Sequence, residues 1–378
     1  MSFATTLGSL YRPTGGILPA SELASLTIVD DNAPTDYVDI SGTRWDSDNL
    51  NKQTSNFVAI APTHPEYGAL NLVSGSTTTE IGDLEFNFDG DRFTLMLQTF
   101  GHFDLQIYVD DQPIQHDPIE GDHQGYTFVD VKFTATKVSR KIRVVLPIGY
   151  FLQVIHESLD AVTPTADRFS FAIVADSYGA QQYAGPGSHM IGGIPLWIAE
   201  ATGFAVHRLA QGSTGYIADA NSAGGNSEYG STSRMAALDR VEPQAILFWG
   251  TINDGAHSPQ DIADAADATW TAVAAQHPGV PIIVAGIQPY GRPAGAQATR
   301  NDALRAAAAA HPAVVKFIDW YGVTAADAWW SGTGSQNSPV GDGRQDVVLG
   351  PDTIHPSTRG ARYIASRFVA ELSEVELG

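Results

Sequence analysis

The chain has 378 residues, a formal net charge of −21 at pH 7 and no cysteine. The absence of cysteine excludes disulfides, thiolate catalysis and cysteine-ligated zinc, and it leaves the cellular compartment open. The negative charge disfavours binding to nucleic acid or to an anionic membrane. No apolar run reaches the ~18 residues of a membrane span. The sequence leaves the oligomeric state unknown.

Residues 1–50 carry little periodic pattern, and we interpret them as an N-terminal arm. Within them, Pro19 to Leu26 could form one short helix. The arm could serve assembly or simply pack on the domain that follows. It has no basic segment followed by an apolar run, so no secretory signal is expected. The protein would then act in the cytoplasm, or outside the cell or on a virion by a non-classical route.

Residues 51–160 have the short runs and frequent alternation of an all-β domain. Turns rich in Asp and Gly separate several runs, and this spacing favours an accessory β-sandwich of the jelly-roll kind. Residues 93–98 and 104–109 are predicted to be neighbouring strands. The polar, proline-containing segment 160–167 then serves as a linker. The expected strands are residues 55–60, 70–73, 84–88, 92–98, 103–109, 126–133 and 141–145.

From residue 168 to residue 378, strands alternate with helices. This alternation predicts an α/β domain in which a parallel sheet lies between two layers of helices. Ligands of such sheets bind beyond the carboxyl ends of the strands. The expected strands are residues 169–174, 205–209, 245–249, 281–287 and 314–318. The expected helices are residues 191–201, 259–276, 296–310 and 357–372, the last with Ser357 as its cap.

The first of these strands stops abruptly at Asp176-Ser177, with Gly179 just beyond. A hydroxyl at the end of a buried strand, beside a glycine that permits a tight turn, is where α/β enzymes place a nucleophile. The same residues also suit a strand that is followed by an Asp-Ser helix cap. This stretch alone leaves both interpretations open.

Asp352 and His355 stand three residues apart, directly before the last expected helix. In one turn of chain this spacing can place both side chains on the same side. The carboxylate could then accept the proton of His355 Nδ1 and leave Nε2 free as a base, for which Ser177 is the candidate hydroxyl. Alone, the pair could equally be a capping Asp and an incidental His-Pro turn.

Gly212 and Asn253 each follow a strand of the expected sheet. Acyl transfer through a serine builds an oxyanion, which needs hydrogen-bond donors that are already in place. A glycine N–H can approach closely, an Asn amide donates well, and both could face Ser177. Gly215, in the same loop, is a rival to Gly212. Singly, these residues suit a turn glycine and an Asx turn; together, in this order, they favour an oxyanion hole.

These residues resemble the four sequence blocks of the SGNH (GDSL-like) hydrolases. Ala175-Asp176-Ser177 matches the first block and Gly212 the second; Thr251-Ile-Asn253-Asp254 matches the third and Asp352-Thr-Ile-His355 the fourth. The match covers about residues 169–373, with Ala175 and Thr251 at positions where the family has glycine. An α/β-hydrolase shares the order Ser, Asp, His, but the tight Asp352 to His355 spacing favours the SGNH family.

The resemblance implies a three-layer α/β/α fold and a serine esterase without a cofactor. It implies that Ser177 is the nucleophile, His355 the base and Asp352 the residue that orients the base. The N–H groups of Ser177 and Gly212 and the side chain of Asn253 would hold the oxyanion.

A β-sandwich ahead of an SGNH domain resembles certain carbohydrate O-acetylesterases. The expected partner is therefore an acylated small molecule or polysaccharide, and acetyl is the expected acyl group. The alternatives are a general carboxylesterase or lipase, and a glycan-binding or structural protein with an inactive SGNH domain.

Metal and cofactor sites have little support in the sequence. No phosphate-binding loop is present, and most histidines are scattered before prolines or in loops, so we expect no catalytic metal. Trp320, Trp329 and Trp330 lie between the last strand and the Asp-His pair. They could border the active-site cleft or simply pack in the core.

Overall fold

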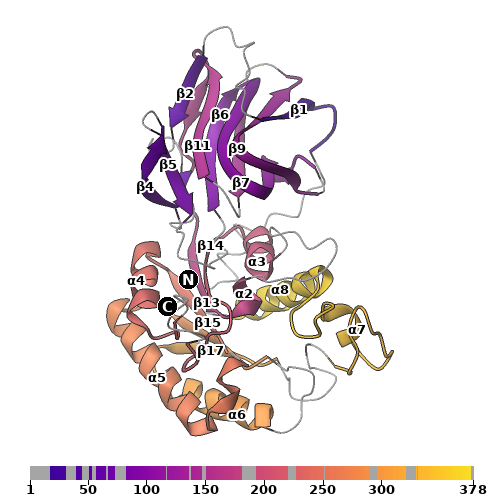
Figure 1. Cartoon of the computed structure of the whole chain (residues 1–378). Coiled ribbons are helices and arrows are strands. Elements are labelled where there is room, and N and C mark those ends of the chain that lie inside the picture. The colour runs from indigo at the N-terminus through magenta and orange to yellow at the C-terminus, as the bar shows by residue number, and fades with distance from the viewer. Residues whose placement is uncertain are drawn as a thin grey trace. The chain divides into compact units, whose positions relative to one another are not determined.

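The chain divides after Arg168 into a β unit and an α/β unit in its computed structural model (Figure 1). No helix among the described residues is both long enough and apolar enough to cross a membrane. The structure describes residues 18–30, 40–44, 51–52, 57–64, 67–72, 82–115, 117–135, 138–146, 150–180, 193–219, 227–250, 252–288, 296–320, 329 and 331–375.

The β unit is a curled antiparallel sheet with the hydrogen-bonded order β12-β6-β10-β7-β11-β5-β4. β1 joins the sheet through β9, which itself pairs with β7. Its core lies inside the curl, where Phe86 and Phe88 meet Phe93 edge to face. The strands are β1 (Leu23–Asp30), β2 (Ile40–Arg44), β3 (Asn51–Lys52), β4 (Phe57–His64), β5 (Tyr67–Leu72), β6 (Gly82–Gly90), β7 (Arg92–Val109), β8 (Gln112–Pro113), β9 (Ile119–Phe133), β10 (Val138–Leu146), β11 (Tyr150–Glu157) and β12 (Ala161–Thr163).

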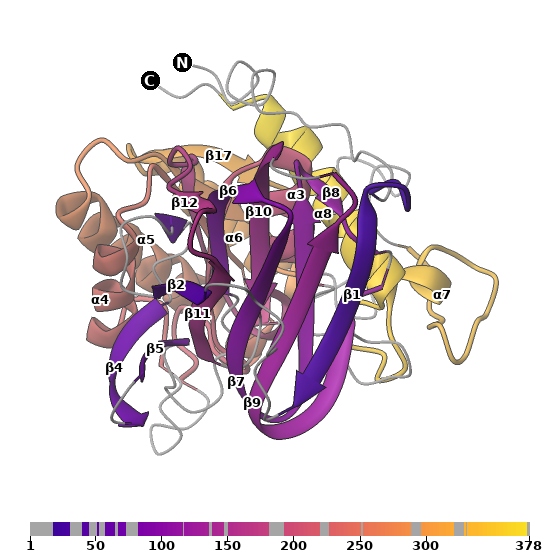
Figure 2. The same ribbon diagram turned by 90° about the horizontal axis from the view of Figure 1, so that it is seen from above.

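The long strand β7 corrects one prediction. Residues 93–98 and 104–109 are two halves of this single strand and not neighbours in the sheet. β9 pairs with β7 through residues 99–103 without a break, and the two strands run side by side in Figure 2. Residues 99–103 interrupt the regular alternation but stay within the strand, and the Thr99 and Thr127 hydroxyls are 3.1 Å apart across the two strands. Gly101 has a φ of +116°, which a glycine adopts without strain.

The helix predicted from Pro19 to Leu26 is also wrong, because residues 20–22 form a turn and β1 begins at Leu23. β1 pairs with the last part of β9, from Thr127 to Phe133. The β-branched run Thr27-Ile28-Val29 favours a strand, and Leu23 and Leu26 pack against the core. Residues 23–30 are therefore part of the sheet.

The α/β unit is built on a parallel sheet with the order β14-β13-β15-β16-β17. Its strands confirm the predicted alternation: β13 (Ser170–Ala175), β14 (Ala205–Ala210), β15 (Ala245–Trp249), β16 (Ile282–Ala285) and β17 (Val314–Ile318). The helical segments are α2 (Ser177–Ala180), α3 (Ile194–Thr202), α4 (Thr232–Val241), the 3₁₀ helix η1 (Asn253–Ala256), α5 (Pro259–Gln276), α6 (Ala296–Ala310), α7 (Gln345–Val348) and α8 (Thr358–Ser373).

Helices cover both faces of this sheet, as predicted. Alternate residues of β13 and β15 pack on α3 and α8 on one face. The intervening residues pack on α4, α5 and α6 on the other face. Ser357 caps α8 as expected, since its hydroxyl accepts the Gly360 N–H at 3.0 Å. The three-layer α/β/α fold is confirmed.

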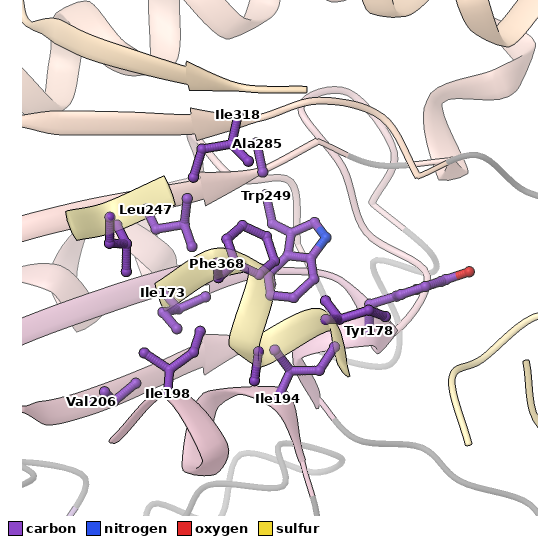
Figure 3. Packing of buried hydrophobic residues seen from close by; sticks show 14 of the residues in the cluster. Ile173, Tyr178, Ile194, Ile198, Val206, Leu247, Trp249, Ala285, Ile318 and Phe368 are labelled. Atoms are coloured by element: carbon purple, nitrogen blue, oxygen red, sulfur yellow. The ribbon is translucent and has the colours of Figure 1, made fainter. Parts of the chain in front are cut away.

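The tryptophans after the last strand belong to the core. Trp320 is 0% exposed and Trp329 is 1% exposed, and both rings pack against Phe368 of α8. Trp249 at the end of β15 packs on the same phenylalanine, as Figure 3 shows. Core packing is therefore their role, and Trp330 lies outside the described residues.

Candidate active site

Ser177 begins α2 immediately after β13. The buried Asp176 carboxylate accepts the Tyr178 N–H at 2.9 Å and so caps this short turn. Gly179 allows the turn to pack on the sheet, because a Cβ there would lie 2.4 Å from the Ala175 Cβ. The helix-cap and the nucleophile interpretations of Asp176-Ser177 are thus compatible, because Asp176 makes the cap and leaves the Ser177 hydroxyl for other contacts.

The structure brings Ser177, His355 and Asp352 together, although they come from opposite ends of the α/β unit. His355 Nε2 lies 2.8 Å from Ser177 Oγ, and His355 Nδ1 lies 2.6 Å from Asp352 Oδ2. Asp352 Oδ1 accepts the N–H groups of Ile354 and His355 at 3.0 and 2.9 Å. One carboxylate therefore fixes both the imidazole ring and the turn that carries it.

These contacts set the charge state of Asp352. Burial raises the pKa of Asp352, but hydrogen bonds from the His355 side chain and the two backbone N–H groups outweigh it. The pKa of Asp352 therefore lies below its ordinary value of 3.8. The carboxylate is charged at neutral pH, as an acceptor for the Nδ1 proton must be.

The two expected oxyanion donors lie on the loops after β14 and β15. Gly212 stands in the turn that follows β14. Asn253 opens η1, and its Nδ2 donates to the Thr214 carbonyl at 2.9 Å and to Asp176 Oδ2 at 3.3 Å. Asn253 is thus tied to the Gly212 loop on one side and to the Ser177 turn on the other.

Gly215 has a different task in this loop. Its N–H donates to the Ala218 carbonyl at 2.9 Å. A Cβ on Gly215 would lie 2.4 Å from Asp254 Oδ1, so the close approach of that carboxylate requires a glycine. The Gly215 N–H is therefore already used within the loop.

Asp254 holds the same loop through its backbone. Its fully buried carboxylate accepts the N–H groups of Tyr216, Ile217 and Ala218 at 2.9, 3.1 and 2.8 Å. Burial raises the pKa of Asp254 above its ordinary value, although the three N–H groups act in the opposite direction. Asp254 thus holds the backbone of this loop, whereas Asn253 joins the loop to the Asp176 carboxylate.

Sequence reasoning missed two buried residues beneath the site. Arg234 of α4 donates to the carbonyls of Ala175 and Leu209 at 2.9 and 3.0 Å, at the ends of β13 and β14. Burial lowers the pKa of Arg234 to about 10. Gln288, which follows β16, donates its Nε2 to Asp176 at 3.1 Å. The sequence did carry a signal for Arg234, because this charged residue lies on the same helix face as the apolar Leu238. It carried no signal for Gln288.

A model of the GDSL-like lipase/acylhydrolase family matches residues 176–363 of the chain. This part of the chain belongs to the GDSL-like lipase/acylhydrolase family. The protein is therefore an ester hydrolase by family, with the four SGNH blocks in the expected order. A search of curated proteins found no sequence relative.

Solved structures with the same fold include carbohydrate esterases and an acyltransferase. A family two carbohydrate esterase from Clostridium thermocellum, in complex with cellohexaose, is 12% identical, with a TM-score of 0.59 over 85% of this chain and 97% of that one. An acetyl xylan esterase from the rumen bacterium Butyrivibrio proteoclasticus is 10% identical, with a TM-score of 0.59 over 88% and 98%. The salicylyl-acyltransferase SsfX3 of a tetracycline biosynthetic pathway is 12% identical, with a TM-score of 0.63 over 90% and 99%. At this identity the likeness concerns the fold.

Proposed function

We propose that this GDSL-like hydrolase is a serine esterase that removes short acyl groups, acetyl first among them, from a carbohydrate. The observation that carries the proposal is the hydrogen-bonded chain from Ser177 Oγ through His355 to Asp352, at 2.8 and 2.6 Å. Both distances lie in the range that proton transfer and tautomer control require.

In the first half-reaction, Ser177 Oγ attacks the ester carbonyl carbon and its proton moves to His355 Nε2. Asp352 accepts the Nδ1–H and stabilises the imidazolium that forms. The C–O bond to the alcohol then breaks, and His355 returns the proton to the leaving oxygen. Water repeats the sequence on the acyl-enzyme: His355 takes its proton, the acid leaves, and Ser177 recovers its hydroxyl proton.

The oxyanion of each tetrahedral intermediate would accept the N–H groups of Ser177 and Gly212 and one N–H of Asn253. The Asn253 amide has two hydrogens to donate, and of its two hydrogen bonds the one to the Thr214 carbonyl is shorter than the one to Asp176. We infer that the 3.3 Å contact with Asp176 is the one exchanged for the oxyanion. Gly212 is preferred to Gly215 because the Gly215 N–H bonds within its own loop.

The carbohydrate substrate is supported by the shared two-part fold of the carbohydrate esterases. The fold is also shared with an acyltransferase, so the fold alone does not choose between water and an alcohol as acceptor. A general carboxylesterase or lipase is the second candidate. A glycan-binding protein with an inactive domain is the third, and the intact Ser177–His355–Asp352 geometry argues against it.

The test is the hydrolysis of p-nitrophenyl acetate by the full chain and by Ser177→Ala. We expect kcat to fall by about 10⁴- to 10⁶-fold in Ser177→Ala, and by about 10²- to 10³-fold in Asn253→Ala. Ser366→Ala is the matched control, because this serine is exposed on α8 and its hydroxyl bonds only its own helix at Tyr363. Equal turnover by wild type and Ser177→Ala would overturn the proposal.

The acyl and alcohol groups are then separated by two substrate series. p-Nitrophenyl esters of increasing chain length report the acyl preference, and acetylated glycans report the alcohol. Activity confined to short acyl groups and retained on acetylated glycans supports deacetylation. Rising activity with chain length would favour the lipase.

A further inference from the structure

Tyr178 directly follows Ser177 and reaches the segment that carries His355. Its side chain is 1% exposed, and its hydroxyl donates to the Ile354 carbonyl at 2.5 Å. Figure 3 shows the ring at the edge of the packed cluster, with the hydroxyl oxygen pointing away from Trp249 and Ile194. A buried tyrosine hydroxyl needs such a partner, and here the partner is the residue immediately before the candidate base.

The Tyr178 ring also lies beside the imidazole. The centroids of the Tyr178 and His355 rings are 5.7 Å apart, and the ring planes are tilted by 48°. The backbone of Tyr178 is fixed by its N–H, which donates to Asp176 Oδ1 at 2.9 Å. Tyr178 is thus anchored to the nucleophile's turn and contacts the base's turn through both its hydroxyl and its ring.

The turn from Asp352 to His355 has reason to need an outside contact. Thr353 is β-branched and has a φ of +63°, a left-handed conformation that costs energy in every residue except glycine. The Asp352 carboxylate stabilises this turn from within. The Tyr178 hydroxyl adds a hydrogen bond from the nucleophile's segment, so the backbone on either side of the Ser177–His355 pair is tied together.

We propose that Tyr178 is a positioning residue of the esterase, and that its hydroxyl sets the Ser177–His355 distance by holding the Ile354 carbonyl. This inference rests on the proposed function of Ser177 and His355. Proton transfer depends on a separation near 3 Å, and a misplacement of about 1 Å can lower a rate about 10²-fold. Tyr178 acts through His355, so its hydroxyl affects kcat and leaves substrate binding unchanged.

The test is a double-mutant cycle with Tyr178→Phe, which keeps the ring and removes only the hydroxyl. We expect Tyr178→Phe to lower kcat about 10- to 100-fold, with KM within about twofold of wild type. In the His355→Ala background, the same change should alter the residual kcat by less than about twofold, because the group it positions is gone. Tyr363→Phe is the matched control. Tyr363 lies on α8, and its hydroxyl contacts the Arg344 side chain at 3.4 Å and neither Ser177 nor the turn of His355.

Two results would overturn the proposal. One is a kcat for Tyr178→Phe within twofold of wild type. The other is an equal loss in the wild-type and His355→Ala backgrounds, which would mean that Tyr178 acts independently of the base. Ser177→Ala, measured alongside, separates the proposed function from the role of Tyr178. If Ser177→Ala abolishes turnover but Tyr178→Phe leaves turnover unchanged, only the Tyr178 proposal fails. If Ser177→Ala is fully active, both fail.

Discussion

The buried ion pairs of the β unit and the buried charges next to the candidate site have different kinds of partner. In the β unit, Arg143 forms a bidentate pair with Asp83 at 2.7 and 3.0 Å, and Arg168 pairs with Glu85. In the α/β unit, the buried Arg234 and Asp254 bind backbone carbonyls and N–H groups. These ion pairs of the β unit join side chain to side chain, although its buried Arg140 also donates to the Gly90 carbonyl. Arg234 and Asp254 instead hold strand ends and a loop next to the candidate site.

This difference follows the position of the candidate site. Arg234 fixes the strand ends just before Ser177 and Gly212, and Asp254 fixes the loop that follows Gly212. A paired buried charge mainly decides whether its own unit is stable. A buried charge that binds the backbone of a site loop also decides where that loop stands, so its loss should appear in catalysis.

Among the charged residues that hold the backbone of the site, Asp352 should have the largest effect on kcat when it is replaced, as in Asp352→Asn. Asp352 binds two backbone N–H groups and the imidazole, so the amide would lose the charge and favour the wrong tautomer of His355. We expect kcat to fall about 10³- to 10⁴-fold on p-nitrophenyl acetate. A kcat within tenfold of wild type would remove Asp352 from the proposed machinery.

The stability of Asp352→Asn relative to wild type should depend on pH. The pKa of Asp352 is lowered in the folded protein, so the charged carboxylate contributes stability above its ordinary pKa of 3.8 and loses it as pH falls through the lowered value. The difference in Tm between wild type and Asp352→Asn should therefore be present at neutral pH and shrink below about pH 4. A gap that grows toward acid would contradict the direction of the shift.

Arg234→Met and Arg143→Met test the comparison itself. We expect Arg234→Met to lower kcat about 10²-fold, because the strand ends before Ser177 and Gly212 lose a common anchor. Arg143→Met should destabilise the β unit by about 1.5–3 kcal/mol and leave kcat within about twofold, since Asp83 loses its bidentate partner and keeps the 3.5 Å contact with Arg168. Steady-state kinetics at a temperature below both unfolding transitions measure the change in kcat, and urea unfolding measures the change in stability. An equal loss of kcat in both variants would refute the distinction.

Thr353→Gly should have the smallest effect. Glycine adopts the φ of +63° without the cost of a Cβ, but it also gains freedom in the unfolded chain. We expect the free energy of unfolding to rise by less than about 1 kcal/mol, read from urea unfolding. Thr353→Ala keeps the Cβ and should bring no gain. A Thr353→Gly variant that is no more stable than Thr353→Ala would contradict strain at this φ.

Much of the α/β unit could be read from its sequence. β15, β17, α5 and α6 have the predicted bounds, because buried parallel strands are continuous apolar runs and the helices have a clear period. The β unit was harder, because the irregular stretch through Thr99 and Gly101 lies within a strand whose pairing partner is distant in sequence.

The site shows the same limit. Ser177, Asp352 and His355 could be proposed because each stands at the end of a recognisable element, in a known order. Arg234 and Tyr178 could not, since their roles depend on contacts across 59 and 176 positions of the chain, to Ala175 and Ile354. Tertiary contacts of this kind leave no periodic mark in a single sequence.

We propose above all that Ser177 is a nucleophile activated by His355. The most direct measurement is covalent labelling by a serine-directed phosphonate, followed by mass spectrometry of the intact chain and of its peptides. We expect one adduct, on the peptide that contains Ser177. It should be absent in Ser177→Ala and form much more slowly in His355→Ala. Labelling at another residue, or labelling that survives Ser177→Ala, would contradict this proposal.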